Sequence, residues 1–418
     1  MYKFAHIADC HLGANREPEL RKLEVEAFKK SIDECLLRKV DFIIISGDIF
    51  HSNLPDMWVV SEAVRKMREA VEQGIRIYVV YGSHDYSPSE TSIIDVLDSA
   101  GLVNRVGAGE IKDGSLLLKF TIDPKTKAKL TGISARKLGI EREYYTILDR
   151  DSLEREPGFK IFVFHTMISE LKPLDLSKTE SMQLSYLPSG FNYYAGGHPH
   201  KTIVKSFEGY PFIVYPGPLF AKDSKDFEEA AKGVKRGFYV VEFDSQVRNT
   251  EFIEVKVCDY YFEEYDATGK TPSQVTNDLA EKLRKADLNN KIVLLKVSGE
   301  LASGKTADVD FTSIRRIIME RGALHARINR YGLTSKEYTS IKVKGSDVKE
   351  VEEKIFEENL RTVKLSNQKL TSTEGVKLAL NLLKVLRDPP KVNESKDDYL
   401  NRIRSQALNV LGVSEDER

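Results

Sequence analysis

The feature that most constrains this chain is a continuous apolar run, Phe42 to Ile45, within the stretch VDFIIISGDIFH. A run of large apolar residues without polar alternation is typical of a strand buried on both faces, as at the centre of a parallel sheet. The run leads into Gly47-Asp48, so a carboxylate follows the carboxyl end of a central strand. Ligands and catalytic groups of open α/β sheets collect there. An aspartate in that place can also simply cap the next helix, so other residues must decide its role.

Expected strands alternate with expected helices over the first hundred residues. The periodicity predicts strands at Tyr2–Ala8, at the central run and at Ile75–Tyr81, and helices over Leu20–Leu36, Met57–Val71 and Ser92–Ala100. This alternation indicates a mostly parallel sheet with polar motifs at its strand ends.

The region from Gly107 to about Asp244 favours a second sheet. Six apolar segments separated by Gly and Pro fit strands: Leu116–Ile122, Lys129–Ser134, Lys160–His165, Thr202–Ser206, Phe212–Tyr215 and Phe238–Phe243. We therefore predict an α/β (α+β) fold in which a two-sheet β-sandwich flanked by helices occupies residues 1–250.

Residues 251–345 suggest a small α+β accessory domain. The segment Thr271 to Gln274 combines an N-cap, a first-position proline and a glutamine that closes a capping box. After this helix, the pattern predicts a strand over Lys291–Val297, a helix over Phe311–Glu320 and a strand over Ala323–Asn329. A strand–helix–strand–helix–strand unit of this length is a common accessory domain.

Positive charge gathers between residues 301 and 345. Nine Lys and Arg residues oppose four acidic ones, a net charge of +5; the bases are Lys305, Arg315, Arg316, Arg321, Arg327, Arg330, Lys336, Lys342 and Lys344, and the acids are Asp308, Asp310, Glu320 and Glu337. Such a stretch is either a solvated face or a contact with a phosphate backbone. The candidates for a DNA contact are Arg315, Arg316, Arg327 and Arg330.

The remaining residues, 346–418, read as polar helices broken at Asp388-Pro389-Pro390. Their apolar positions include Leu380, Leu383, Ile403 and Leu408, more than lone surface helices need. These side chains either pack back on the chain's own body or dock a partner helix. We favour a partner.

Composition limits the location and the class of protein. The chain has 418 residues, 41% hydrophobic and 30% charged, with no basic leader, no run of membrane-spanning length and three scattered cysteines. We expect a cytoplasmic protein without a disulfide framework. Because Lys+Arg of 63 nearly cancel Asp+Glu of 64, any nucleic-acid site must be a local patch.

The distribution of histidines indicates that the catalytic site lies in the first half of the chain. Seven of the eight precede residue 201, and ligand-type residues follow several expected strands: Asp9, His11, Asp48, His165, His198 and His200. In an extended segment Asp9 and His11 would point the same way, and so would His198 and His200. One histidine on an apolar strand is usually a core residue, but six ligand types recurring at strand ends predict a dimetal centre.

A carboxylate has two oxygens, so Asp48 can bridge two cations about 3.5–4 Å apart. Ligation by oxygen and imidazole without thiolate suits manganese, iron or zinc, and we favour two manganese ions per subunit. His84, beside the site, is placed to donate a proton to the leaving oxygen.

The motifs Asp9-x-His11, Gly47-Asp48-x-x-His51, Gly82-Ser83-His84-Asp85, His165 and Gly197-His198-x-His200 occur in this order. The set resembles the calcineurin-like metallophosphoesterases. Within that superfamily, GDIFH and GHPHK resemble the meiotic recombination eleven (SbcD-like) family of DNA double-strand-break repair nucleases. These motifs cover roughly the first 220 residues.

The resemblance implies roles for the matching residues. Asp9, His11, Asp48 and His200 would hold one manganese, and Asp48, His165, His198 and Ser83 would hold the other. His84 would assist the leaving group and His51 would line the site. The implied activity is a manganese-dependent 3′-to-5′ exonuclease and single-strand endonuclease.

The resemblance also implies an assembly. The nuclease domain would form a homodimer through helices, for which Met57–Val71 and Ser92–Ala100 are our candidates. The accessory domain would cap DNA, and residues 346–418 would bind an SMC-like coiled-coil ABC ATPase.

One position departs from the family pattern. Ser83 stands where an asparagine is usual, and its shorter hydroxyl predicts a weaker second metal site. Two other functions remain open: a phosphoesterase acting on other substrates with the same metal core, or a DNA-end-binding scaffold whose catalytic site has decayed at Ser83.

Overall fold

A computed structural model describes residues 1–85, 91–136, 140–176, 179–336, 348–362, 370, 372–391, 394 and 396–412. The chain divides into two compact units, Met1–Thr334 and Ser335–Arg418. Glu337, Lys342, Lys344 and the predicted domain boundary after residue 345 lie outside the described residues. Across the described part, no helix is both long and apolar enough to cross a membrane.

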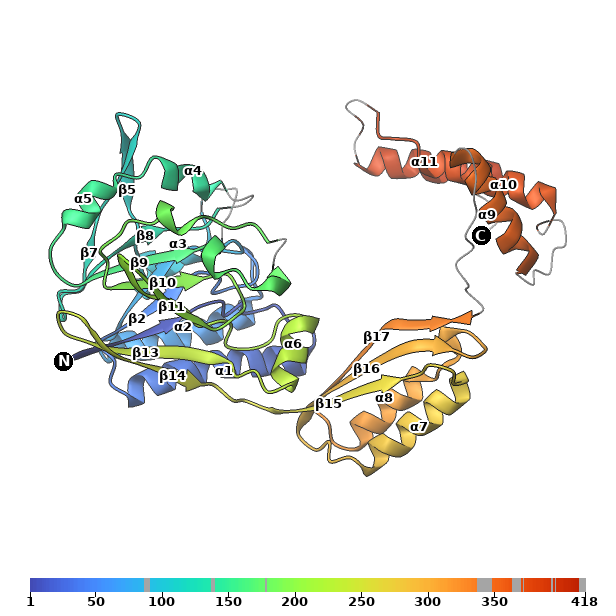
Figure 1. Ribbon diagram of the computed structural model, residues 1–418, viewed down its shortest axis with the longest axis horizontal. Helices are drawn as coiled ribbons and strands as arrows, with labels where there is room; N and C mark the ends of the chain where they lie inside the picture. The colour runs from blue at the N-terminus through green and yellow to red at the C-terminus, as the bar shows by residue number, and fades with distance from the viewer. Residues whose placement is uncertain are drawn as a thin grey trace. The chain divides into compact units, whose positions relative to one another are not determined.

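The first unit is built on two six-stranded sheets packed face to face (Figure 1). The first sheet has the order β14-β13-β1-β2-β3-β4, with β1 (Tyr2–Ile7), β2 (Phe42–Ser46), β3 (Arg76–Val80) and β4 (Asn104–Arg105) parallel. β13 (Gly237–Phe243) and β14 (Val247–Glu254) complete it in antiparallel register. The predicted apolar run is thus the centre of a mostly parallel sheet.

The second sheet has the order β11-β12-β10-β9-β8-β7. Its strands are β7 (Thr121–Ile122), β8 (Lys129–Ile133), β9 (Lys160–His165), β10 (Tyr193–Gly197), β11 (Ile203–Phe207) and β12 (Tyr210–Tyr215). The four central strands are parallel, while β7 and β11 run antiparallel to their neighbours. The mixed α/β class and the two-sheet sandwich are as predicted.

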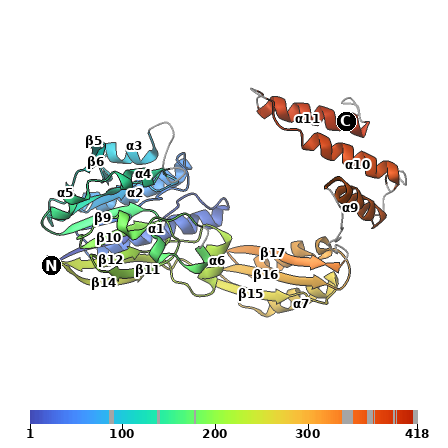
Figure 2. The same ribbon diagram turned by 45° about the horizontal axis from the view of Figure 1, so that its top comes forward.

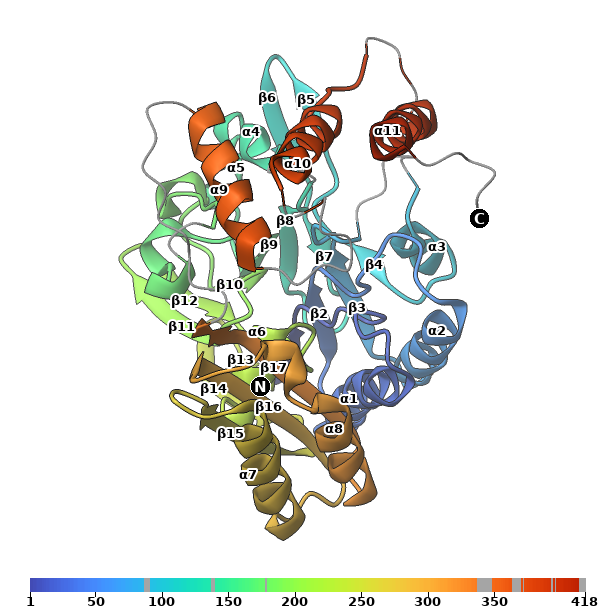
Figure 3. The same cartoon turned by 90° about the vertical axis from the view of Figure 1, so that its right-hand side faces the viewer.

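Alternate residues of each strand serve different cores. Phe42 and Ile44 of β2 meet Ile161 and Val163 of β9 between the sheets. The intervening residues of β2, Ile43 and Ile45, face helices instead. Those helices are α1 (Pro18–Leu37), α2 (Met57–Glu72) and α3 (Ile93–Ser99), and Figure 3 shows α1 and α2 on the side of the sandwich opposite β11 and β12. A further layer covers the outer face of the second sheet. It contains α4 (Glu141–Thr146), α5 (Arg150–Arg155) and three 3-10 turns at Ser169–Leu171, Leu174–Leu176 and Leu184–Tyr186.

One sheet assignment and one strand prediction in this region are wrong. Phe238–Phe243 belongs to the first sheet, because the returning chain pairs with the free edge of β1. Leu116–Ile122 is not one strand: β6 (Ser115–Leu118) forms a separate hairpin with β5 (Gly109–Lys112), and β7 follows it. The hairpin turn is Asp113-Gly114, both at positive φ, a sequence that favours a two-residue turn. β10 and β14 were not predicted.

The accessory part of the first unit is a three-stranded sheet, whose strands lie side by side in Figure 2, with two helices on one face (Figure 1). It contains β15 (Asp259–Asp266), α7 (Pro272–Lys285), β16 (Lys291–Leu301), a 3-10 turn at Thr306–Asp308, α8 (Phe311–Glu320) and β17 (His325–Ser335). Thr271 and Gln274 close the predicted capping box of α7. This part has a hydrophobic core of its own. The division of the chain at residues 250 and 345 remains a prediction.

The second unit consists of α9 (Val348–Thr362), α10 (Thr373–Leu386) and α11 (Lys396–Leu411). α10 contacts both other helices. Ile403 is buried, whereas Leu380, Leu383 and Leu408 are half-buried. Leu386, Leu400 and Leu411 are exposed at 47–59% of their surface, which leaves apolar area available outside the unit's own core.

Candidate metal centre

The predicted ligands come together where parallel strands of both sheets end. Asp9 and Asp48 follow β1 and β2 of the first sheet, His165 ends β9 and His198 follows β10 of the second. Ser46 joins the two edges, because its carbonyl accepts a hydrogen bond from His165 Nδ1 at 2.7 Å and its hydroxyl donates to the carbonyl of Ala195 at 3.1 Å. Facing strand ends thus bring together side chains distant in sequence.

The carboxylate of Asp48 lies between His11 and His165. Its Oδ2 is 3.5 Å from His11 Nε2 and 3.2 Å from His165 Nε2. His11 Nε2 also faces His200 Nε2 at 3.0 Å. Two groups of candidate ligand atoms, Asp9–His11–His200 and Asp9–Asp48–His165, each lie within 4.8 Å of one another.

The donor set fits divalent cations. Carboxylate oxygens and imidazole nitrogens without thiolate are the ligands of manganese, iron and zinc. His165 Nε2 and His11 Nδ1 are buried without a hydrogen-bond partner. Because a buried nitrogen without a partner is costly, and His165 Nε2 is aimed at the Asp9 and Asp48 carboxylates, an ion between them would satisfy it.

Ser83 and His198 lie at the edge of this cluster. Both line a cavity of about 460 Å³ with His165, and the rings of His198 and His165 are 5.3 Å apart between centroids. The backbone N–H of His198 donates to Asp9 Oδ1 at 3.0 Å. Among the described residues, the close groups of carboxylate and imidazole atoms do not include His198, so its place as a metal ligand stays a prediction, as does that of Ser83.

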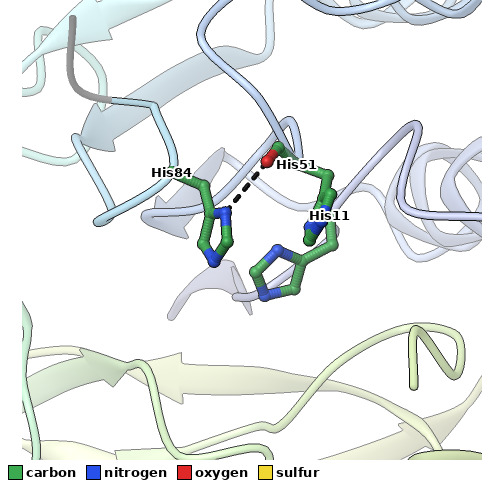
Figure 4. Close-up of side chains that lie close together, drawn as sticks. All are labelled: His11, His51 and His84. Atoms are coloured by element: carbon green, nitrogen blue, oxygen red, sulfur yellow. Dashed lines mark hydrogen bonds between the residues drawn. The ribbon is translucent and has the colours of Figure 1, made fainter. Parts of the chain in front are cut away.

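Two further histidines, His51 and His84, lie beside His11 of the first group (Figure 4). His84 Nδ1 donates to the carbonyl of His51 at 2.9 Å, which fixes the His84 tautomer and leaves Nε2 available. The rings of His51 and His84 stack at 4.6 Å between centroids. Burial and, to a smaller extent, the charge of His84 lower the pKa of His51 to about 4. Burial also lowers the pKa of His84, although Asp48 opposes the shift.

The backbone of the centre is not extended, contrary to the predicted geometry. Asp9, His11 and Asp48 have φ values of 52°, 45° and 52°, and His198 has φ of 102°. Left-handed backbone in non-glycine residues persists only where surrounding structure enforces it, commonly at functional sites. The side chains converge because of these turns, not because of strand alternation.

Asp85, for which the sequence suggested no role, supports two of the turns. Its fully buried carboxylate accepts hydrogen bonds from the N–H groups of Gly82 at 3.0 Å, Phe50 at 3.2 Å and Ile49 at 3.3 Å. Burial and the charge of Asp48 raise the pKa of Asp85 to about 7. Asp85 thus ties the loop that carries Asp48 to the loop that carries Ser83.

Asp226 is a second residue that sequence reasoning missed. It lies in the first turn of α6 (Ser224–Ala231), is 3% exposed, and accepts a hydrogen bond from His200 Nδ1 at 2.8 Å. Arg236 Nη2 donates to its other oxygen at 3.2 Å. A carboxylate on the outer nitrogen fixes the tautomer of a ligating histidine and raises its basicity. The helix-start pattern Asp223-Ser224 was the available signal.

The buried charges interact strongly. Burial would lower the pKa of His165, but the charges of Asp48 and Asp9 outweigh it and raise the pKa to about 9. Burial opposes ionisation of Asp48, yet His165 and His11 hold its pKa well below the ordinary value. Asp48 is therefore a carboxylate held among imidazoles, the state that a cation requires.

Comparisons with known proteins agree with this geometry. Residues 2–202 match the family described as Calcineurin-like phosphoesterase. The chain is 28% identical to a DNA double-strand break repair protein Mre11 of Archaeoglobus fulgidus over 62% of this chain and 60% of that one. It is 29% identical to the protein of the same name from Methanopyrus kandleri over 61% and 57%, respectively.

The matched part therefore spans less than two thirds of these two relatives. Among solved structures, a dimetal phosphatase from Danio rerio aligns with 61% of this chain and 99% of its own length, at 10% identity and a TM-score of 0.39. Residues 2–202 of this chain are a calcineurin-like phosphoesterase domain.

Proposed function

We propose that this protein is a manganese-dependent DNA nuclease that processes DNA ends in double-strand-break repair. It acts as a 3′-to-5′ exonuclease on duplex DNA and as an endonuclease on single strands. The observation that carries the proposal is the position of Asp48 Oδ2 between His11 and His165. The similarity to two proteins named DNA double-strand break repair protein Mre11 supports the choice of DNA.

Each set of ligands has a distinct task in this proposal. Asp9, His11, Asp48 and His200 hold one manganese; Asp48, His165, His198 and Ser83 hold the other, more weakly. Two such ions, when bound, lower the pKa of a bridging water and neutralise charge on the phosphate. Asp226 keeps His200 in its ligating tautomer, and Asp85 holds the Asp48 turn.

His84 is the proposed catalytic acid. Its Nδ1 is committed to the His51 carbonyl, so a proton for the leaving oxygen has to come from Nε2. His51 lines the site and holds the His84 ring by stacking.

The parts beyond the phosphoesterase domain are proposed to handle DNA and partners. Arg315, Arg316, Arg327 and Arg330 are candidates to contact DNA from the accessory part. Leu380, Leu383, Ile403 and Leu408 are candidates to bind an SMC-like ABC ATPase. The homodimer through the helices α2 and α3 belongs to the same proposal.

One experiment tests the function. Purified protein is incubated with end-labelled duplex and single-stranded DNA and manganese, beside Asp48→Ala and a small phosphate ester. We expect DNA degradation by the wild type and a loss of at least about 1,000-fold in Asp48→Ala. Ester turnover without DNA degradation would support another phosphoesterase. DNA binding without degradation, even with the ATPase and ATP, would support a scaffold.

A further inference from the structure

The loop between β12 and α6 places a lysine beside the metal centre. Lys222 is half-buried and lines a cavity of about 210 Å³ together with His198, His200 and Lys201. Lys201 forms an ion pair with Glu229. Within the part of the chain that the structure describes, no acidic side chain pairs with the ammonium group of Lys222. A third lysine of the cavity, Lys225, also has an interaction within the structure. Lys222 is therefore a cation of this cavity that is available to a ligand.

The backbone under Lys222 is fixed on both sides. Its N–H donates to Asp226 Oδ2 at 3.4 Å, the oxygen that also accepts from His200. The carbonyl of the preceding residue, Ala221, accepts from Asn15 Nδ2 at 3.0 Å. The side chain thus extends from a rigid stem that shares a carboxylate with a metal-ligand histidine, and binding through it loses little backbone entropy.

The charge of Lys222 acts on the histidines of the centre. Burial is the main cause that lowers the pKa of His11, and Lys222 lowers it further. The same two causes act on His51, His84 and His198. The geometry places Lys222 beside two of the candidate ligands, His198 and His200, with which it lines the same cavity.

We propose that Lys222 binds a non-bridging oxygen of the phosphate that the centre hydrolyses. This inference rests on the proposed function, because it takes the ligand to be a phosphodiester. A lysine ammonium is a compact charge with three donors and suits a phosphate oxygen. A preorganised cation also stabilises the negative charge that develops during hydrolysis, so Lys222 serves both binding and catalysis.

The test compares Lys222→Ala and Lys222→Arg with Lys205→Ala, which removes an exposed lysine of β11. Two substrates are used, a labelled single-stranded oligonucleotide and bis(p-nitrophenyl) phosphate. We expect Lys222→Ala to lower kcat/KM about 10- to 100-fold on both. Arginine should restore most of the loss, and Lys205→Ala should match the wild type.

Two measurements without turnover separate substrate binding from damage to the metal site. Oligonucleotide binding in EDTA should weaken in Lys222→Ala, with the slope of log Kd against log salt reduced by about 1. Manganese affinity, from calorimetry, should stay the same or rise, because a nearby positive charge is removed. Weaker manganese binding would show a structural role and overturn the proposal.

The remaining outcomes are also decisive. Unchanged kcat/KM on the small diester in Lys222→Ala, or an equal loss in Lys205→Ala, would overturn the phosphate contact. If the wild type cleaves the small diester but neither binds nor cleaves DNA, the proposed nuclease function fails, while the diester data still decide the role of Lys222. A wild type inactive on both substrates and unable to bind DNA would overturn both.

Discussion

Ser83 has the smallest side chain among the candidate ligands, and it lines a cavity together with His165 and His198. A serine hydroxyl reaches less far than an asparagine amide. We expect manganese titration by calorimetry to show one tight and one weak ion. Ser83→Asn should tighten the weak site about 10-fold, because an amide oxygen is a better neutral ligand. Ser245→Asn, at an exposed position, is the control, and two tight ions in the wild type would contradict this idea.

Gly82 shows how closely the turns of the centre approach each other. A Cβ at this position would lie 2.0 Å from Asp48 Oδ1 and 2.2 Å from the Asp48 nitrogen. Gly82→Ala must therefore displace Asp48, and we expect loss of manganese binding at both sites. Gly74→Ala is a control for added bulk alone, because a Cβ there meets nothing within 4 Å, although its φ of 81° adds strain. Calorimetric binding as strong in Gly82→Ala as in the wild type would refute the prediction.

His6 makes acid stability testable, because it is fully buried between Ser46 and Tyr193. Ser46 Oγ donates to Ala195, so His6 Nε2 donates to Ser46 at 2.8 Å, and Nδ1 accepts from Tyr193 at 3.0 Å. Burial lowers the pKa of His6 from 6.5 to about 3. As pH falls, His6 is therefore protonated in the unfolded chain before it is protonated in the folded protein. The free energy of unfolding decreases as pH drops below about 6.5.

Comparing a His6 variant with the wild type at several pH values isolates the contribution of His6 to the loss of stability in acid. His6→Gln lacks the group, so its deficit in unfolding free energy relative to the wild type should shrink by about 3 kcal/mol between pH 7 and pH 4. Urea unfolding at several pH values measures it. Ser245→Gln, at an exposed position without a titrating side chain, is the control. A deficit that stays constant with pH would show that His6 does not carry this proton linkage.

Helix α6 contacts the candidate metal centre through one residue and the accessory part through others. Asp226 on α6 orients His200, while Phe227 packs in the core and lies under the guanidinium of Arg327 at 4.9 Å. Arg327 also donates to Ser224 at 3.2 Å, and Lys296 of β16 pairs with Glu228 at 3.3 Å. The accessory part therefore packs against the helix that supports the candidate metal ligand His200.

Asp226→Asn tests the support that α6 gives to His200. An amide cannot hold the outer nitrogen as a carboxylate does, and loss of such a partner typically costs 10- to 100-fold in metal affinity. We expect a loss in this range for the tighter manganese, measured by calorimetry. Glu228→Gln, two residues along the same helix, should change the affinity less than about 3-fold. Equal affinities in Asp226→Asn and the wild type would contradict the assignment.

The whole molecule consists of two compact units, and all the candidate ligands lie in the first. We expect a protein ending at residue 336 to bind manganese as the full chain does and to keep its thermal midpoint within about 2 °C, because it retains every core described for the first unit. Calorimetric titration and thermal unfolding measure both. Loss of manganese binding on truncation would show that the second unit supports the centre.

The sequence by itself determined where the candidate metal ligands lie along the chain, because an apolar run and the polar residues that follow it are local patterns. Strand ends at Asp48 and His165 needed no tertiary information. Only the tertiary structure decided which sheet β13 joins, since its apolar residues fit either sheet. It also decided the left-handed turns at Asp9, His11 and Asp48 and brought Asp226 and Lys222 to the centre. Those contacts span long stretches of chain, and the residues that make them are common in loops and helix starts everywhere.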